Sequence, residues 1–193
     1  MGEADPFSRF GTWLSEARDR EAGWAEVMTL ATAGEDGRPS ARAVVLTGWD
    51  ERGLVFFTDR RSRKAAELAV RPWAAAVILW PACQRQVRVE GTAVELSDDD
   101  SDAGFGLTPR QGRLVVWAVT QDEVVSGRDV LEHRVGEATV RFAGSEVPRP
   151  PWWQGYRLEA VAFEFWEASP DALHDRFRHR RVDGSWVVER LAP

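Results

Sequence analysis

The stretch from Arg42 to Lys64 constrains the fold of this 193-residue chain more than any other. Two apolar, β-branched runs at residues 42–47 and 54–58 flank Trp49-Asp50-Glu51-Arg52-Gly53, whose residues favour a turn. Ser62 is then placed to cap the helix that follows. The stretch therefore predicts a β-hairpin that leads directly into a short helix.

Two cations, Arg63 and Lys64, open that helix, although the positive end of the helix macrodipole favours anions there. The placement makes sense if an anion binds the free backbone amides and the two side chains close around it. Arg42, one strand back, would supply a third positive group. Lys64 is also the only lysine of the chain. The alternative is a basic turn in solvent, and this stretch alone does not decide between the two.

The rest of the chain alternates between helical and strand periodicity. Apolar residues recur at helical spacing from Pro6 to about Glu21, and residues 84–96 alternate with period two, which indicates a strand with one wet face. The continuous apolar run at 73–80 is expected to be a buried strand, and residues 104–112 a glycine-rich loop. The other expected elements are strands at 25–33, 156–168, 176–181 and 186–191, a helix start at 97–102, a long helix at 129–142 and a hairpin turn at Asp183-Gly184.

About seven strands with helices inserted between pairs indicate a closed antiparallel barrel with helical flanks. The predicted fold class is therefore mainly β (α+β), and residues 1–193 are expected to form a single domain. Too little chain follows the proline-rich link at 144–151 for a separate core.

Composition excludes several classes of function. A net charge of −6 argues against nonspecific nucleic-acid binding, and no apolar run approaches the ~20 residues that span a bilayer. The single cysteine and the three unclustered histidines do not form a metal set, and the acidic run at 97–102 is expected to be a solvated face. Nucleophile-elbow, Walker and dinucleotide motifs are lacking. These features indicate a cytoplasmic protein without a metal, membrane or nucleic-acid partner, whose redox chemistry would need a cofactor.

Four motifs resemble the pyridoxamine 5'-phosphate oxidase family, in the family's order. They are Ser62-Arg63-Lys64, Arg85-Gln86-Val87-Arg88-Val89-Glu90-Gly91, Leu173-His174-Asp175-Arg176-Phe177 and the ending Trp186-Val187-Val188-Glu189-Arg190-Leu191-Ala192-Pro193. The resemblance runs from Asp5 to Pro193. It implies an FMN-binding split β-barrel, and a homodimer with FMN at the interface in which part of each site comes from the second subunit.

The resemblance also implies the residues that hold the cofactor. Those that match the grip on the FMN phosphate are Arg42, Arg63 and Lys64. Those that match the wall beside the ring and ribityl chain are Ala43, Val44, Val45, Leu46, Phe57 and Thr58. Gln86, Gln121, Trp166 and Arg176 match positions that complete the flavin site. Asp122 stands where the family offers a small hydroxyl near the phosphate, and a carboxylate there would repel the dianion unless it turned away or paired with an arginine.

The substrate side departs from the family pattern. The positions where phosphate-oxidising members resemble one another in three cations, a tyrosine and a serine read here Thr47, Gly104, Thr108, Gly112 and Ala172. Of the matched substrate residues only His174 remains, and it is the candidate catalytic group, for orienting the substrate or carrying a proton. A hydrogen-bonded structural histidine is the alternative. The glycines and threonines are expected to leave a roomier, less charged cavity.

The leading hypothesis is an FMN-dependent oxidase that transfers a hydride from a reduced ring substrate to FMN, with reoxidation by O2. Residues 42–80 resemble most the branch that oxidises dihydrophenazine intermediates in secondary metabolism. One alternative is a genuine pyridoxine or pyridoxamine 5'-phosphate oxidase with an altered phosphate site. Another, from a different class, is a protein that binds a flavin without turnover.

Overall fold

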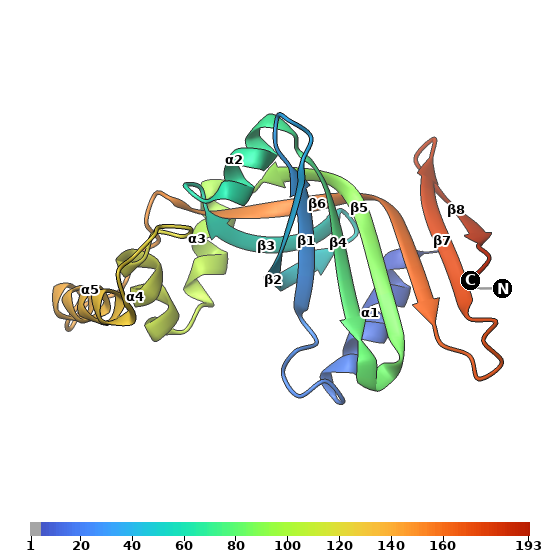
Figure 1. Ribbon diagram of the computed structural model, residues 1–193, viewed down its shortest axis with the longest axis horizontal. Helices are drawn as coiled ribbons and strands as arrows, with labels where there is room; N and C mark the ends of the chain where they lie inside the picture. The colour runs from blue at the N-terminus through green and yellow to red at the C-terminus, as the bar shows by residue number, and fades with distance from the viewer. Residues whose placement is uncertain (1–4) are drawn as a thin grey trace.

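The computed structural model of the chain describes residues 5–193. Within them, eight strands form one antiparallel sheet in the order β3-β2-β1-β4-β5-β6-β7-β8, and β3 also pairs with β6. That extra pairing closes the first six strands into a barrel, and β7 and β8 extend from it as a hairpin (Figure 1). The expected closed antiparallel barrel with flanking helices is confirmed. The strands are β1 (Val27–Ala33), β2 (Pro39–Asp50), β3 (Gly53–Asp59), β4 (Trp73–Trp80), β5 (Arg85–Glu95), β6 (Trp153–Glu167), β7 (Asp175–Val182) and β8 (Ser185–Arg190).

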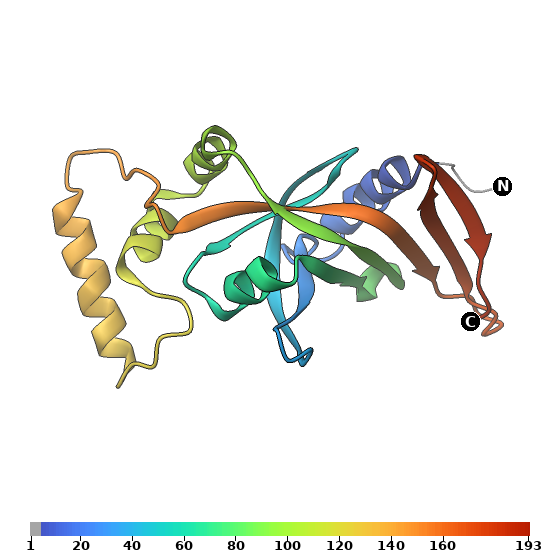
Figure 2. The same cartoon turned by 90° about the horizontal axis from the view of Figure 1, so that it is seen from above.

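Strand β6 is the longest and crosses the whole molecule (Figures 1 and 2). Its first half pairs with β3 and its second half with β7, while β5 pairs along nearly all of it. At the β7 end the chain reverses through Asp183 and Gly184, both with positive φ, as the sequence predicts for this hairpin. Residues at the two ends of β6 therefore belong to opposite ends of the protein.

Helix α1 (Pro6–Arg18) packs its apolar face against the barrel. Asp5 caps it by accepting hydrogen bonds from the backbone amides of Phe7 and Ser8. The Phe7 ring meets Phe163 edge-on with 5.0 Å between centroids, and Trp13 meets Phe165 at 5.3 Å. These aromatic contacts belong to the main hydrophobic core, which fills the interior of the barrel.

Strand β4 spans the expected residues, but it is not buried on both faces. Ala74, Ala76 and Ile78 point into the core, whereas Trp73 and Leu79 are each more than half exposed. Val45 on β2 is 57% exposed as well. The outer face of the sheet is therefore apolar at these positions on β2 and β4, which is typical of a surface that another protein chain covers.

The segment expected as a loop at 104–112 is mostly helical, with a turn only at residues 107–109. Helix α3 (Asp98–Gly106) and helix α4 (Arg110–Ala118) meet at a sharp turn, and α5 (Arg128–Arg141) follows α4. Ser97 caps α3 as the acidic run predicts. Glycine has poor helix propensity, so the sequence alone favours a loop. Helices α4 and α5 make a small core of their own at one end of the molecule (Figure 1).

No helix among residues 5–193 is long and apolar enough to cross a membrane.

Candidate functional site

Helix α2 (Arg63–Val70) begins where the sequence places it. The Ser62 side chain accepts a hydrogen bond from the backbone amide of Ala65, and its hydroxyl lies 3.4 Å from the Thr58 hydroxyl at the end of β3. The two cations of the first turn differ in their surroundings. The Arg63 side chain is 63% exposed, whereas Lys64 is buried with 8% exposure.

The Lys64 ammonium points at neutral oxygens. Its Nζ donates to Thr58 Oγ1 at 3.1 Å and to Gln121 Oε1 at 2.9 Å. Thr58 in turn donates to the same Gln121 oxygen at 2.9 Å. Within residues 5–193 no carboxylate lies at salt-bridge distance from Nζ, and burial lowers the pKa of Lys64. A buried ammonium that contacts no carboxylate favours binding of an anion, even though the nearby Asp122 partly offsets the effect of burial.

Glu67 joins the other two cations. Its carboxylate accepts from Arg63 Nε at 2.7 Å, from Arg42 Nη2 at 3.2 Å, and from the hydroxyls of Thr32 and Ser40. Burial alone would raise the pKa of Glu67, but the hydrogen bonds from these four groups outweigh it and lower the pKa to about 2. Glu67 is thus a fixed anion that positions Arg42 and Arg63. No sequence motif singles out Glu67, although its place four residues after Arg63 is typical of a helical ion pair.

Arg42 is more firmly bound to the protein than the sequence suggests. Its two terminal nitrogens donate to Leu30 O, Thr32, Ser40 and Glu67. We call Arg42, Arg63 and Lys64 the basic clasp. The structure brings all three together at one end of the barrel, beside Thr58 and Gln121.

The loop between α4 and α5 also reaches the clasp. Gln121 contacts Lys64, and Asp122 Oδ2 accepts from the backbone amide of Arg63 at 2.8 Å. Asp122 therefore neither turns away nor pairs with an arginine side chain, the two arrangements expected to relieve repulsion. It binds the free amide of the α2 N-terminus instead.

The wall residues of β2 and β3 divide between the two faces of the barrel. Ala43 and Val45 lie on the exposed outer face, Leu46 is buried, and Val44 is partly buried against the core. Phe57 and Thr58 are neighbours on β3 and point to opposite faces of the strand. The Phe57 ring points toward α3 rather than toward the clasp.

A second group lies on β5, β6 and β7. Gln86 pairs with Trp166 in the sheet, and Trp166 pairs with Arg176, so the three residues are adjacent. Arg176 donates to Glu164 at 2.9 Å and to the carbonyl of Ala192 at 2.8 Å. We call Gln86, Trp166 and Arg176 the distal group.

The clasp and the distal group occupy separate places in one chain. Thr58 pairs with Gln154 on β6, and the distal group sits at Trp166, twelve residues further along the same strand. That count follows the curved strand, however. Across the sheet Arg42 aligns through Leu30 and Ala76 with Val89, three residues from Gln86, so roughly 17 Å separates Arg42 from Gln86. Gln121, in contrast, joins the clasp of its own chain.

The room expected at Gly104 is not present in the described chain. A Cβ on Gly104 would lie 2.2 Å from Cζ of Phe57, so the Phe57 ring already fills this space. At Gly112 only the methyl group of Thr108 is close, 2.9 Å from the place of a Cβ. Thr47 is exposed on β2 and donates to Val55 O, and Ala172 lies in the β6–β7 loop with a φ of +62°.

His174 belongs to the distal end of the molecule. Its ring lies 4.9 Å from the Trp166 ring, and its Nδ1 accepts from the backbone amide of Ser169 at 3.1 Å. In the neutral form the proton is then on Nε2, which remains available to a ligand.

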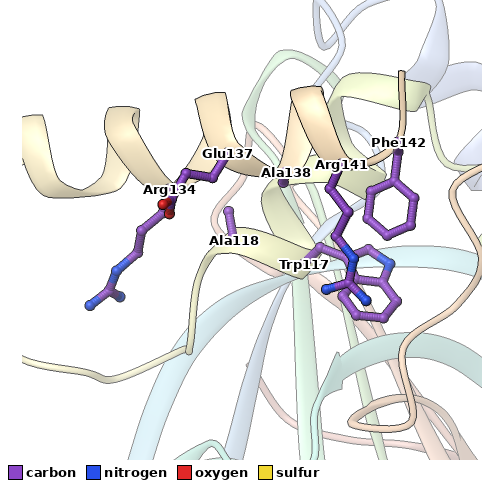
Figure 3. Close-up of a pocket in the computed structure, with 7 residues that line it drawn as sticks. All are labelled: Trp117, Ala118, Arg134, Glu137, Ala138, Arg141 and Phe142. Atoms are coloured by element: carbon purple, nitrogen blue, oxygen red, sulfur yellow. The ribbon is translucent and has the colours of Figure 1, made fainter. Parts of the chain in front are cut away.

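A hollow between α4 and α5 contains none of the predicted site residues (Figure 3). Arg134 pairs with Glu123 beside it, and the Arg141 guanidinium lies over the Trp117 ring at 4.7 Å. Its polar groups are thus engaged within the chain. Within residues 5–193 no group of histidines, cysteines and carboxylates is arranged to hold a metal ion.

Comparisons with known proteins agree with the resemblance drawn from the motifs. Residues 19–142 match the family model described as pyridoxamine 5'-phosphate oxidase, and residues 153–193 match the pyridoxine 5'-phosphate oxidase C-terminal dimerisation region. Curated relatives named pyridoxine/pyridoxamine 5'-phosphate oxidase from Microcystis aeruginosa and Cupriavidus pinatubonensis are each 47% identical, covering 98% of this chain and 89% of the relative.

Two solved structures share the fold. PhzG from Burkholderia lata, crystallised with tetrahydrophenazine-1-carboxylic acid, superposes with a TM-score of 0.92 at 32% identity, over 99% of this chain and 94% of PhzG. A pyridoxamine 5'-phosphate oxidase-related, FMN-binding protein from Nostoc punctiforme gives 0.80 at 22% identity, over the full length of both chains.

Proposed function

This chain belongs to the pyridoxamine 5'-phosphate oxidase family and is an FMN-dependent oxidase, and we propose that its substrate is a reduced, ring-conjugated molecule without the vitamin B6 phosphate. The observation that carries the proposal is the uncharged substrate side. Thr47, Thr108 and Ala172 stand where phosphate-oxidising members of the family resemble one another in cations.

The basic clasp fits the terminal phosphate of FMN. The buried Lys64 ammonium has neutral hydrogen-bond partners in its own chain, and a phosphate dianion would supply a counter-charge in direct contact with it. Arg63 would close over the phosphate from the exposed side, while Glu67 holds Arg63 and Arg42 in place. The redox chemistry, hydride acceptance and return of electrons to dioxygen, is what bound FMN supplies.

The arginines of α4 do not replace the lost cations. Arg110 donates to the backbone carbonyls of Phe142 and Ser145, and Arg113 pairs with Glu146. A charge-assisted hydrogen bond contributes roughly 1.5–3 kcal/mol. Loss of three of them should therefore weaken binding of a phosphorylated vitamer by several orders of magnitude.

A broad, flat substrate suits these surroundings better than a phosphorylated pyridine. The outer face of the sheet is apolar at Val45 and at Leu79, which pairs with Gln86 of the distal group, and the substrate positions are uncharged. The 32%-identical PhzG was crystallised with a partly reduced tricyclic carboxylic acid. We therefore favour a dihydrophenazine-like or similar secondary metabolite. His174 would orient it through Nε2, with Ser169 fixing the ring from the other side.

One observation favours a second candidate function. The relatives at 47% identity are named pyridoxine/pyridoxamine 5'-phosphate oxidase, so the chain could oxidise a phosphorylated vitamer through an altered phosphate site. The test is kcat/KM on pyridoxine 5'-phosphate. We expect a value far below the ordinary range that begins near ~10⁴ M⁻¹s⁻¹, and a value inside that range would establish the second candidate. Restoring Thr47→Lys, Thr108→Arg and Ala172→Arg together should raise activity on this substrate.

A panel of reduced aromatic compounds, with peroxide release as the readout, completes the test. The proposed oxidase should release peroxide with at least one reduced polycyclic compound in the panel. Binding of FMN without peroxide release from any reduced compound would instead indicate a flavin carrier.

We further propose that each flavin site is shared between two chains of a homodimer, in the cytoplasm. Arg42 and Gln86 lie roughly 17 Å apart across the sheet of one chain, and exposed apolar residues on β2 and β4 offer a surface for a second chain. Subunit exchange between two variants tests whether each site is shared between chains. Lys64→Met and Trp166→Ala each damage one part of the site, and a heterodimer of the two variants contains one undamaged site.

After subunit exchange in an equal mixture, high-affinity FMN binding should return to about a quarter of the sites. No recovery in a mixture shown by mass spectrometry to contain heterodimers would refute the shared site. A monomeric mass with flavin still bound would refute the dimer itself.

A further inference from the structure

Asp122 lies beside Arg63 and Lys64 of the basic clasp. It follows Gln121 in the loop between α4 and α5, with a φ of +67°, and its Oδ2 accepts from the backbone amide of Arg63 at 2.8 Å. Arg63 is the first residue of α2. The carboxylate therefore binds a donor that belongs to the free N-terminal amides of that helix.

The bond uses a donor that a phosphate would also seek. Backbone amides at a helix N-terminus, with adjacent cations, are the usual partners of a phosphate group in proteins. Next to Asp122, Lys64 extends its ammonium to Gln121. Asp122 thus binds as an anion at the place where the proposed function puts the FMN phosphate.

The number of charges at the site also suggests that Asp122 opposes phosphate binding. The clasp contributes three cations, and Glu67 and Asp122 contribute two carboxylates, which leaves one positive charge to meet a phosphate dianion. Glu67 positions Arg42 and Arg63 through its four hydrogen-bond partners and cannot be removed without releasing them. Asp122 makes no such hydrogen bonds to the cations, since its bond goes to the backbone, although its charge favours the protonated form of the nearby Lys64.

We propose that Asp122 is an internal anion that caps α2 in the unliganded protein and that gives up the Arg63 amide when a flavin phosphate binds, so that it lowers the affinity for FMN. The proposal rests on the proposed FMN site. A contact made only in the unliganded state stabilises that state, and by linkage it reduces the binding free energy by the same amount.

The experiment compares Asp122→Ser and Asp122→Asn with the unchanged protein. Removal of the charge should lower the FMN dissociation constant about tenfold in a flavin-fluorescence titration. The same variants should lower the melting temperature of the protein without flavin, and the difference should disappear at saturating FMN. Asn keeps the size and an acceptor oxygen of Asp, so it tests the charge if Ser disturbs the loop.

Asp5→Ala is the matched control, because Asp5 caps α1 through the same kind of bond away from the clasp. It should lower the melting temperature with and without FMN and leave the dissociation constant unchanged. An unchanged or weaker FMN affinity in both Asp122 variants would overturn the inference while leaving the FMN site intact. If neither the unchanged protein nor the variants bind FMN, the proposed function fails together with it.

Discussion

Replacing Lys64 with methionine tests whether the buried ammonium exists for a ligand. Methionine keeps an unbranched chain of similar size but removes the charge. Nζ is bonded only to Thr58 and Gln121 within the described chain, and Thr58 also donates to Gln121 directly at 2.9 Å. Both neutral partners therefore stay hydrogen-bonded after the substitution. We expect the free energy of unfolding of the flavin-free protein to change by less than about 1 kcal/mol.

The effect on the cofactor should be much larger. A charge-assisted hydrogen bond to a phosphate contributes about 1.5–3 kcal/mol, and each 1.4 kcal/mol changes a dissociation constant about tenfold. Lys64→Met should therefore raise the FMN dissociation constant by about 10- to 150-fold. The two measurements together separate a ligand-binding lysine from a structural one, which would change the stability and not the affinity.

The assay is a flavin-fluorescence titration, with chemical denaturation of the flavin-free protein alongside it. Arg38→Met is the control for a simple change of net charge, since Arg38 is exposed and its only described ion-pair partner is Asp36 of the same turn. An FMN affinity within twofold of the unchanged protein would refute the reasoning. So would a loss of stability equal in size to the loss of binding.

Two further predictions concern the surroundings of the clasp. Glu67→Gln should cost roughly 3 kcal/mol of stability at pH 7, and because the pKa of Glu67 is lowered from 4.5 to about 2, this difference should shrink as the pH falls from 4.5 toward 2; a constant difference in melting temperature would contradict it. Gly104→Ala should cost about 1–3 kcal/mol, since its Cβ would meet the Phe57 ring at 2.2 Å. In denaturation experiments Gly106→Ala, in the same helix with open space around it, should be neutral or stabilising.

Local chemistry predicted most of the fold. The hairpin between β2 and β3, the Ser62 cap of α2 and the turn at Asp183-Gly184 depend on residues close in sequence, and the structure confirms all three. The loop prediction for residues 104–112 was wrong because the structure there depends on residues far apart in sequence. Gly104 is helical because α3 packs closely against Phe57, a contact across 47 residues that no local pattern reports.

In the candidate site, too, features set by residues close in sequence were predicted, and contacts between distant segments were not. The positions of the three clasp cations followed from the hairpin and the helix start. Glu67 did not, because its bonds to Thr32, Ser40 and Arg42 depend on how the barrel closes. The contact between Asp122 and the Arg63 amide also joins two distant segments. Sequence patterns identified which residues carry charge, and the fold determines which of those charges neutralise one another.

The fold depends more strongly on the residues around the clasp than on the proposed substrate positions. Glu67 connects two strands and α2 through four hydrogen-bond partners, so a change on the cofactor side disturbs the barrel itself. Thr47, Thr108 and Ala172 lie on an exposed strand face, in a turn between helices and in a loop. Substitution at such positions usually costs little stability. Under the proposed assignment of these positions to the substrate, a change of substrate with the same cofactor is therefore the change that this architecture accommodates most readily.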